Sequence, residues 1–169
     1  MHAFMTGLWI LVGILAGTVI EILVREFQDR RRQKRQISAV IKELQFNLYR
    51  VDLNIEWLKE YQGAIAADNP ARFLRWFSLT SMLSVVTNQL LQSGKLYDLL
   101  STDEVIQVQG FFSFHSAVAE RSINDQAAAQ RLVLNKQQAD MEILFWRTRF
   151  DEQRKNLVQV IKNLEELAG

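Results

Sequence analysis

The chain has 169 residues, a formal net charge of +1 and no cysteine. This length suits one small domain with an additional anchor, and the lack of cysteine excludes disulfides, thiol catalysis and thiolate metal sites. The charge is unevenly spread, with −1 over residues 1–24, +4 over residues 25–35 and −2 over residues 36–169. Because the excess of positive charge is confined to one short segment and the rest of the chain is mildly acidic, we expect no nucleic-acid partner.

An apolar segment opens the chain. Phe4–Val24 contains twelve Leu, Ile, Val or Phe residues and a single charge, Glu21. The apolar residues contribute about −4 to −7 kcal/mol to membrane insertion, which outweighs a cost of about 2.5–3.5 kcal/mol for Glu21. The segment therefore predicts a transmembrane anchor over residues 1–24. A cleaved secretory signal and a buried core helix are the alternatives, but the flanking charge and the length favour neither.

A basic segment follows over residues 25–35, with six basic and two acidic residues. The positive-inside rule places this side in the cytoplasm and the N-terminus outside, so we expect a single-pass protein of the plasma (inner) membrane. The same side chains could hold anionic lipid headgroups. A nuclear-import or nucleic-acid patch is the third interpretation. The six basic residues are Arg25, Arg30, Arg31, Arg32, Lys34 and Arg35.

Small residues line one side of the predicted anchor. Gly13 and Gly17 are four residues apart, and Gly7 precedes them. This spacing leaves a flat strip on which another transmembrane helix can pack closely, although it also occurs by chance.

A long helix is predicted over residues 36–67 as a continuation of the anchor, and Asp68-Asn69-Pro70 is expected to end it. Its apolar residues recur at alternating steps of four and three, which is typical of a coiled-coil seam. Val40, Asn47, Asn54 and Tyr61 lie beside this seam at heptad spacing, either as buried residues that fix register or as a polar flank. The seam consists of Ile37, Ile41, Leu44, Leu48, Val51, Ile55, Leu58 and Ile65.

A second helix is predicted over residues 70–92, with Ser93-Gly94 as its stop. Its first turns mix aromatic residues with arginine, a composition found at interface hot spots. The segment is either a partner site at the far tip or a plug for the end of the core with the arginines in water. Its residues are Arg72, Phe73, Arg75, Trp76 and Phe77.

Two more helices complete the expected bundle. Ser101 and Glu104 have capping-box spacing and predict a helix start, and apolar residues continue that helix to Ala119. Two positions could cap the end of this helix, residues 122–125 and Asn135, and the sequence does not choose between them. A last helix is predicted over residues 136–168.

The residues predict no catalytic centre. His115 stands on an apolar helical face and lacks the Glu-x-x-His pattern of bundle di-iron sites. Neither a glycine-rich phosphate loop nor a zinc ligand set occurs in the sequence. His115 is therefore expected to be a packed, hydrogen-bonded core histidine. We expect no metal, cofactor or small-molecule substrate.

Together these patterns predict an all-α protein with one N-terminal transmembrane helix and a cytoplasmic antiparallel bundle of about four helices over residues 36–169. The function expected from this architecture is that of a non-enzymatic accessory or scaffold subunit, docked through its anchor on a larger membrane protein complex. The alternative is a homo-oligomeric signalling or defence effector that relays a change between membrane and bundle. An enzyme is the third and least favoured class.

Overall fold

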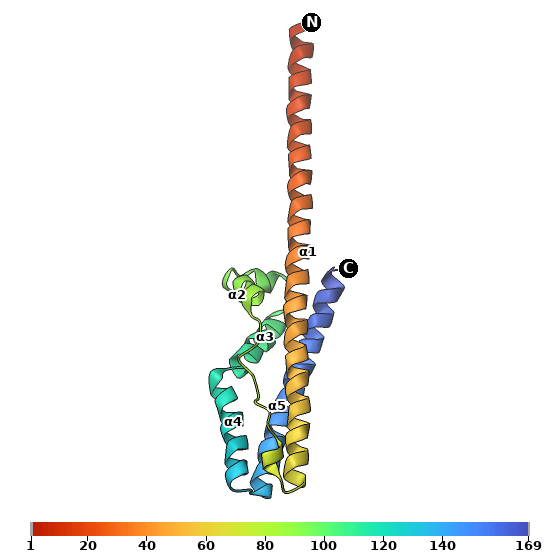
Figure 1. Ribbon diagram of the computed structural model, residues 1–169. Coiled ribbons are helices and arrows are strands. Elements are labelled where there is room, and N and C mark those ends of the chain that lie inside the picture. The colour runs from red at the N-terminus through yellow and green to blue at the C-terminus, as the bar shows by residue number, and fades with distance from the viewer. Residues whose placement is uncertain (1, 169) are drawn as a thin grey trace. The chain divides into compact units, whose positions relative to one another are not determined.

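The computed structural model describes the backbone of residues 2–168 and the side chains of residues 14–168. Over residues 2–168 it is all-helical and contains no strand. Five α-helices, α1 (His2–Ala66), α2 (Val85–Gln92), α3 (Thr102–Phe114), α4 (Ala117–Leu132) and α5 (Lys136–Ala168), are joined by two short 3-10 helices, η1 (Pro70–Arg72) and η2 (Lys95–Asp98) (Figure 1). The chain divides into two compact units, residues 1–38 and 39–169.

The first unit is the N-terminal part of α1. From Ile14 to Phe27 its large apolar side chains are exposed. Glu21 pairs with Arg25 at 2.5 Å and Glu26 with Arg30 at 2.6 Å, both one helical turn apart. Such exposed pairs stabilise a helix only slightly.

Among the described residues, no helix is long and apolar enough to cross a membrane. The predicted span, Phe4–Val24, includes residues 4–13, whose side chains lie outside the described part of the chain. The transmembrane anchor therefore stays a prediction.

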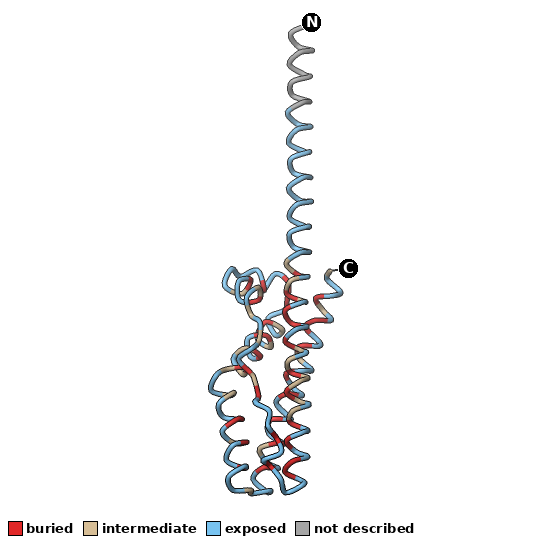
Figure 2. Tube along the Cα trace, viewed as in Figure 1, coloured by how far each residue is buried: buried red, intermediate tan, exposed pale blue. Residues whose placement is uncertain are grey.

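The second unit is a helical bundle built on the C-terminal part of α1 and on α5. Buried residues recur along both helices (Figure 2). Arg154 on α5 donates to Asp52 on α1 at 2.7 Å, and Gln45 donates to Glu165 at 3.2 Å. The contact residue on α1 moves back from Asp52 to Gln45 while its partner on α5 moves forward from Arg154 to Glu165. The two helices therefore run in opposite directions.

The buried face of α1 is shifted from the predicted seam. Leu44, Val51, Leu58 and Ile65 are buried, but Ile41, Leu48 and Ile55 are only half-buried, while Ile37 belongs to the first unit. The four neighbouring positions are at most 3% exposed, so their interpretation as a polar flank is wrong. These positions are Val40, Asn47, Asn54 and Tyr61.

The ends of α1 and α2 follow the sequence signals. Asp68 adopts a left-handed conformation (φ 55°), and the N–H groups of Asp68 and Asn69 bond back to the carbonyls of Ile65 and Ala64. This is the Schellman pattern of a helix end, and Pro70 then opens η1. Gly94 ends α2 with a left-handed φ of 75°, as Ser93-Gly94 predicts.

The predicted helix over residues 70–92 is wrong, because only its last third is α-helical. Residues 73–84, here called the strap, form a largely extended segment between η1 and α2, with a turn at Thr80 and Ser81 (Figure 1). Phe77 and Leu79 are fully buried and Ser78 and Thr80 are less so, which is the alternation of an extended chain. Serine and threonine compete with helical hydrogen bonding, and the strap has four of them.

The strap has no neighbouring strand, so side chains from α4 and α1 satisfy its backbone. Phe77 N–H donates to Asn124 Oδ1 at 2.9 Å, and Asn124 Nδ2 donates to the Phe77 carbonyl at 2.8 Å. Asn47 makes the same two bonds with Leu83, both at 2.7 Å. Asn54 donates to the Ser78 carbonyl at 3.4 Å. The buried asparagines thus hold a segment of their own chain.

Two carboxylates complete this arrangement. The Glu120 carboxylate accepts hydrogen bonds from Leu79 N–H at 2.7 Å and from Thr80 N–H and Oγ1 at 2.8 Å. Glu43, which is 6% exposed, accepts from Val86 N–H at 2.9 Å and Thr87 N–H at 3.0 Å. Ser84 makes no side-chain cap to α2, so the N-terminus of α2 is capped by a carboxylate from α1.

The remaining helices differ from prediction at one point. The capping box is confirmed, because Ser101 N–H donates to Glu104 at 2.7 Å and Glu104 N–H to the Ser101 hydroxyl at 3.4 Å. The predicted helix through Ala119 instead breaks at His115 and Ser116, and Ser116 caps α4. The last helix, α5, has the predicted bounds.

Replacing Asn124 with Ala should destabilise the fold strongly. The change leaves the buried N–H and carbonyl of Phe77 without partners, and each such group costs about 1–3 kcal/mol. We expect the free energy of unfolding, measured by urea titration of the full chain in detergent micelles, to fall by about 2–4 kcal/mol. Asn88→Ala is the control, because Asn88 is exposed and bonds only a serine side chain. Equal losses in the two variants would contradict the role of Asn124.

The strap contact of Glu120 should depend on pH. Partial burial raises the pKa of Glu120, but the hydrogen bonds from Thr80 and Leu79 together outweigh burial and lower the pKa below its usual 4.5. A lowered pKa in the folded state stabilises the fold above about pH 5, and this contribution is lost as the pH falls through the folded-state pKa.

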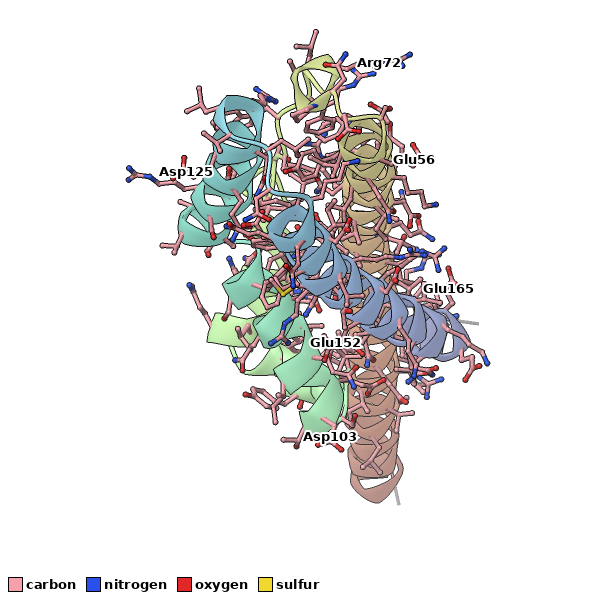
Figure 3. The ribbon with its side chains drawn as sticks, turned by 90° about the horizontal axis from the view of Figure 1, so that it is seen from below. Glu56, Arg72, Asp103, Asp125, Glu152 and Glu165 are labelled. Atoms are coloured by element: carbon pink, nitrogen blue, oxygen red, sulfur yellow. The ribbon has the colours of Figure 1, made fainter. Side chains whose placement is uncertain are left out.

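Glu120→Gln should therefore cost about 1–3 kcal/mol of unfolding free energy at pH 7 and clearly less at pH 3. Glu56→Gln is the control, because Glu56 is exposed and points away from the unit (Figure 3). A cost for Glu120→Gln that is the same at both pH values would argue against the carboxylate contact.

Candidate partner-binding groove

An open groove of about 950 Å³ lies between the end of α3, the start of α4 and the first half of α5. The groove forms at the break between α3 and α4, because the chain turns at His115 and Ser116 instead of continuing as one helix. Aromatic and aliphatic side chains supply most of its walls. They are Phe114, Val118, Met141, Phe145 and Trp146.

These walls are unusually open to solvent. Val118 is 79% exposed, Met141 60% and Phe145 52%. Behind them Phe114 packs against Trp146 at 5.9 Å and against Phe150 at 5.9 Å between ring centroids. The groove therefore has a fixed aromatic floor and an apolar rim, which is the usual composition of a binding surface.

Polar side chains also line the groove, from Ser113, Ser116, Ser122, Gln126, Glu142, Arg149 and Gln153. Trp146 Nε1 donates to Gln126 Oε1 at 2.7 Å, which orients the indole ring. Gln153 is only 8% exposed and lines the groove, and its Oε1 is buried with no partner among the described residues. A buried oxygen of this kind favours an occupant that donates a hydrogen bond.

The outer face of α5 adjoins the groove. Met141, Leu144, Phe145 and Thr148 recur at helical spacing and line a second hollow of about 450 Å³. Leu144 is 65% exposed. These four residues, here called the α5 stripe, lie opposite the buried face of α5, which includes Ile143, Trp146 and Phe150. The stripe therefore takes no part in the core of the bundle.

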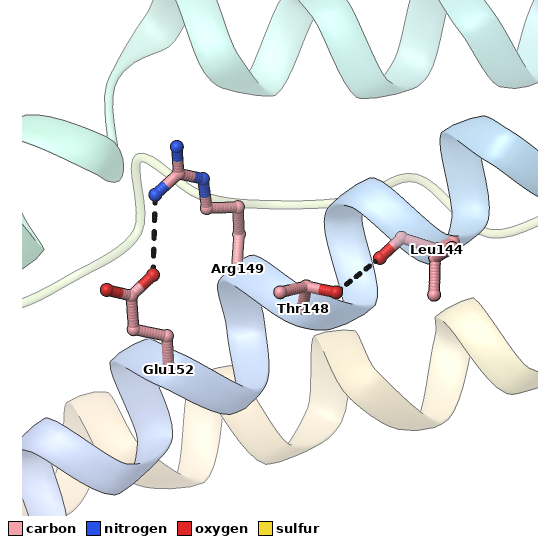
Figure 4. Close-up of polar contacts among 4 residues, drawn as sticks. All are labelled: Leu144, Thr148, Arg149 and Glu152. Atoms are coloured by element: carbon pink, nitrogen blue, oxygen red, sulfur yellow. Dashed lines mark hydrogen bonds and ion pairs between the residues drawn. The ribbon is translucent and has the colours of Figure 1, made fainter.

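Charged side chains border the stripe. Arg149 donates to Glu152 at 3.3 Å (Figure 4). The Arg149 guanidinium also lies 5.8 Å from the centre of the Phe145 ring. Thr148 Oγ1 donates to the Leu144 carbonyl one turn back, so its methyl group is left for the surface (Figure 4).

His115 is a packed histidine beside the groove, as predicted. It is 7% exposed, its Nδ1 lies 2.8 Å from the Phe111 carbonyl, and its ring centre is 4.1 Å from that of Phe111. Burial lowers the pKa of His115 to about 4, although the bond to Phe111 opposes this shift. Nδ1 therefore carries the proton and donates, and the ring is neutral at pH 7. Over the described residues, no group of three or more potential ligands could hold a metal ion.

The structure does not gather the predicted site residues into one place. Phe73 and Phe77 of the strap are buried, whereas Arg72, Arg75 and Trp76 are exposed. Arg72 points to the outside of the bundle in Figure 3. Phe73 and Phe77 fill the core with the arginines in water, as one interpretation expects, but Trp76 is 62% exposed, and the partner site at this segment stays a prediction.

The N-terminal residues are placed only in part. Gly7 and Gly13 lie outside the residues whose side chains are described, while a side chain at Gly17 would meet no atom within 4 Å. The six basic residues from Arg25 to Arg35 are exposed. Sequence reasoning missed the groove, and the one signal for it was Ser116, a helix-capping residue inside an apolar stretch.

Comparison of the chain with protein-family models, with curated proteins and with solved structures finds no match.

The neutral state of His115 should make the fold sensitive to acid. Because the folded pKa lies below the usual 6.5, the unfolded chain takes up a proton that the folded chain does not, and stability falls as the pH drops from 6.5 to about 4. This term amounts to about 3 kcal/mol. We expect His115→Gln to lower the free energy of unfolding at pH 7. The stability of this variant should no longer fall between pH 6.5 and about 4 through protonation of residue 115. Parallel pH profiles for the two proteins would contradict the buried neutral state.

Proposed function

We propose that this protein is a non-enzymatic, membrane-anchored accessory subunit whose helical unit binds a helix of a partner protein in the groove. The observation that carries the proposal is the groove itself, with its exposed apolar rim and its buried, unpaired Gln153 oxygen. A solvent-exposed apolar surface of this kind costs solubility and is typical of a site that a partner covers. Amphipathic helices bind such grooves through apolar residues at helical spacing.

The membrane part of the proposal is supported by the sequence. Phe4–Val24 has the length and composition of a membrane span, and its described apolar residues from Ile14 to Val24 are exposed. The basic residues after it favour a cytoplasmic location for the bundle and contact with anionic headgroups of the inner membrane. Open space beside Gly17 favours close packing with another membrane helix of a larger complex.

Gly17→Leu tests this proposal, because a leucine side chain would fill the packing strip. We expect the tagged full chain, extracted in native-lipid discs, to co-purify with a membrane complex in fixed ratio, and Gly17→Leu to lose most of that complex. Gly63→Leu is the matched control, since Gly63 is an exposed glycine of the same helix with nothing within 4 Å of an added side chain. Recovery of the Gly17→Leu protein with its complex unchanged would refute docking through the anchor.

A further inference from the structure

The α5 stripe carries an ordered pattern of charge on its two sides. With 3.6 residues per turn, Asp140 and Arg147 fall on one side of the stripe, and Glu142 and Arg149 fall on the other. On each side the acid precedes the base by seven residues. All four side chains are exposed or half-exposed. Between residues 140 and 149, each edge of the stripe is therefore acidic first and basic after it, and Asp151 follows Arg147 on its edge.

This pattern is complementary to itself when a second α5 runs in the opposite direction. The stripe is symmetric about the midpoint between Leu144 and Phe145, so reversal places Leu144 opposite Phe145 and Met141 opposite Thr148. In an antiparallel helix pair, each edge faces the same edge of the other helix. Asp140 then faces Arg147 of the second copy, and Glu142 faces Arg149 of the second copy. A twofold axis generates each of these pairs twice.

The parallel arrangement is disfavoured by the same charges. In a parallel pair, one edge of the stripe faces the opposite edge of the second copy, and equal residue numbers lie at the same height. Asp140 would then lie near Glu142 of the second copy, and Arg147 near Arg149 of the second copy. Like charges in an interface select against that arrangement. The charge pattern thus favours a second α5 as the partner and favours the antiparallel direction over the parallel one.

We propose that the occupant of the α5 stripe and of the adjoining groove is α5 of a second copy of this chain, packed antiparallel about Leu144 and Phe145. The inference rests on the proposed partner-binding function and names its partner. Met141 and Phe145 belong to both the stripe and the groove wall, so one helix covers both surfaces. The paired subunit is then the unit that docks on the membrane complex.

The existing contacts of the two arginines do not oppose this exchange of partners, whereas Glu142 must release Gln138 and Gln130, which donate to its carboxylate at 2.8 Å and 3.4 Å. Arg149 pairs with Glu152 at 3.3 Å and Arg147 with Asp151 at 3.9 Å within α5 (Figure 4 shows the first). Their side chains are 50–57% exposed, and surface pairs of this kind contribute little to stability. Both arginines can therefore turn toward a second copy with little loss.

Because the chain has no cysteine, introduced cysteines report the pairing directly. Met141→Cys and Thr148→Cys are made in separately tagged full chains, and the two proteins are mixed in detergent micelles and oxidised. In the antiparallel pair Met141 faces Thr148 of the second copy, so a disulfide forms between the two variants. Random mixing limits its yield to about half of the pairs, since two variants combine as like and unlike pairs equally often.

Each variant alone should cross-link poorly. Two copies of position 141 stand seven residues apart along the antiparallel pair, about 10 Å, which exceeds the reach of a disulfide. Efficient cross-linking of Met141→Cys with itself would indicate parallel pairing and overturn the proposal. So would a mixed yield no higher than that of Ile106→Cys mixed with Thr148→Cys, because Ile106 is exposed on α3 away from the stripe.

Charge reversal tests whether the ion pairs set the arrangement. Glu142→Arg, added to both cysteine variants, should slow the mixed cross-link at least tenfold, and the double change Glu142→Arg with Arg149→Glu should restore it. Failure of the double change to restore the rate would overturn the assigned pairing. If no pairing occurs while the membrane complex still co-purifies in lipid discs, the second copy is not the occupant and the accessory function stands.

Discussion

The fold depends on how a buried extended segment satisfies its backbone without a neighbouring strand. An unpaired N–H or carbonyl in the interior costs as much as a lost hydrogen bond, so the strap is stable only because side chains take the place of a strand. Asn47 and Asn124 each pair with both backbone groups of one residue, as a strand neighbour would. Glu120 accepts from the amides of Leu79 and Thr80, and Glu43 accepts from the Val86 and Thr87 amides at the start of α2.

This constraint joins helices that are far apart in the sequence. The strap forms hydrogen bonds with α1 on one side and with α4 on the other. These hydrogen bonds hold α4 in the bundle, because its own apolar face is too small to do so. The buried residues of α4 are Ile123, Asn124, Ala127 and Gln130, of which two are polar. With α4 fixed, the turn at His115 and Ser116 opens the groove beside α5.

Sequence reasoning predicted the parts of this fold that local chemistry decides. Pro70, Gly94 and the Ser101–Glu104 capping box mark helix ends through their own backbone preferences, and the structure has them where they were expected. The strap was missed because Phe73 and Phe77 have a spacing that a helix and an extended chain both allow. Its conformation is decided by Asn47 and Asn124, which are remote in sequence. The groove was missed for the same reason, since its walls come from three helices.

The strap also has a consequence for cleavage of the chain. An extended strand is the shape in which a protease accepts its substrate, through the backbone groups that the strap has already committed to asparagine and glutamate side chains. Cutting between Phe77 and Leu83 thus requires release of these side chains first, so the rate of nicking follows how often α1 and α4 let the segment go. Resistance to digestion at this irregular segment is then a property of the helices around it.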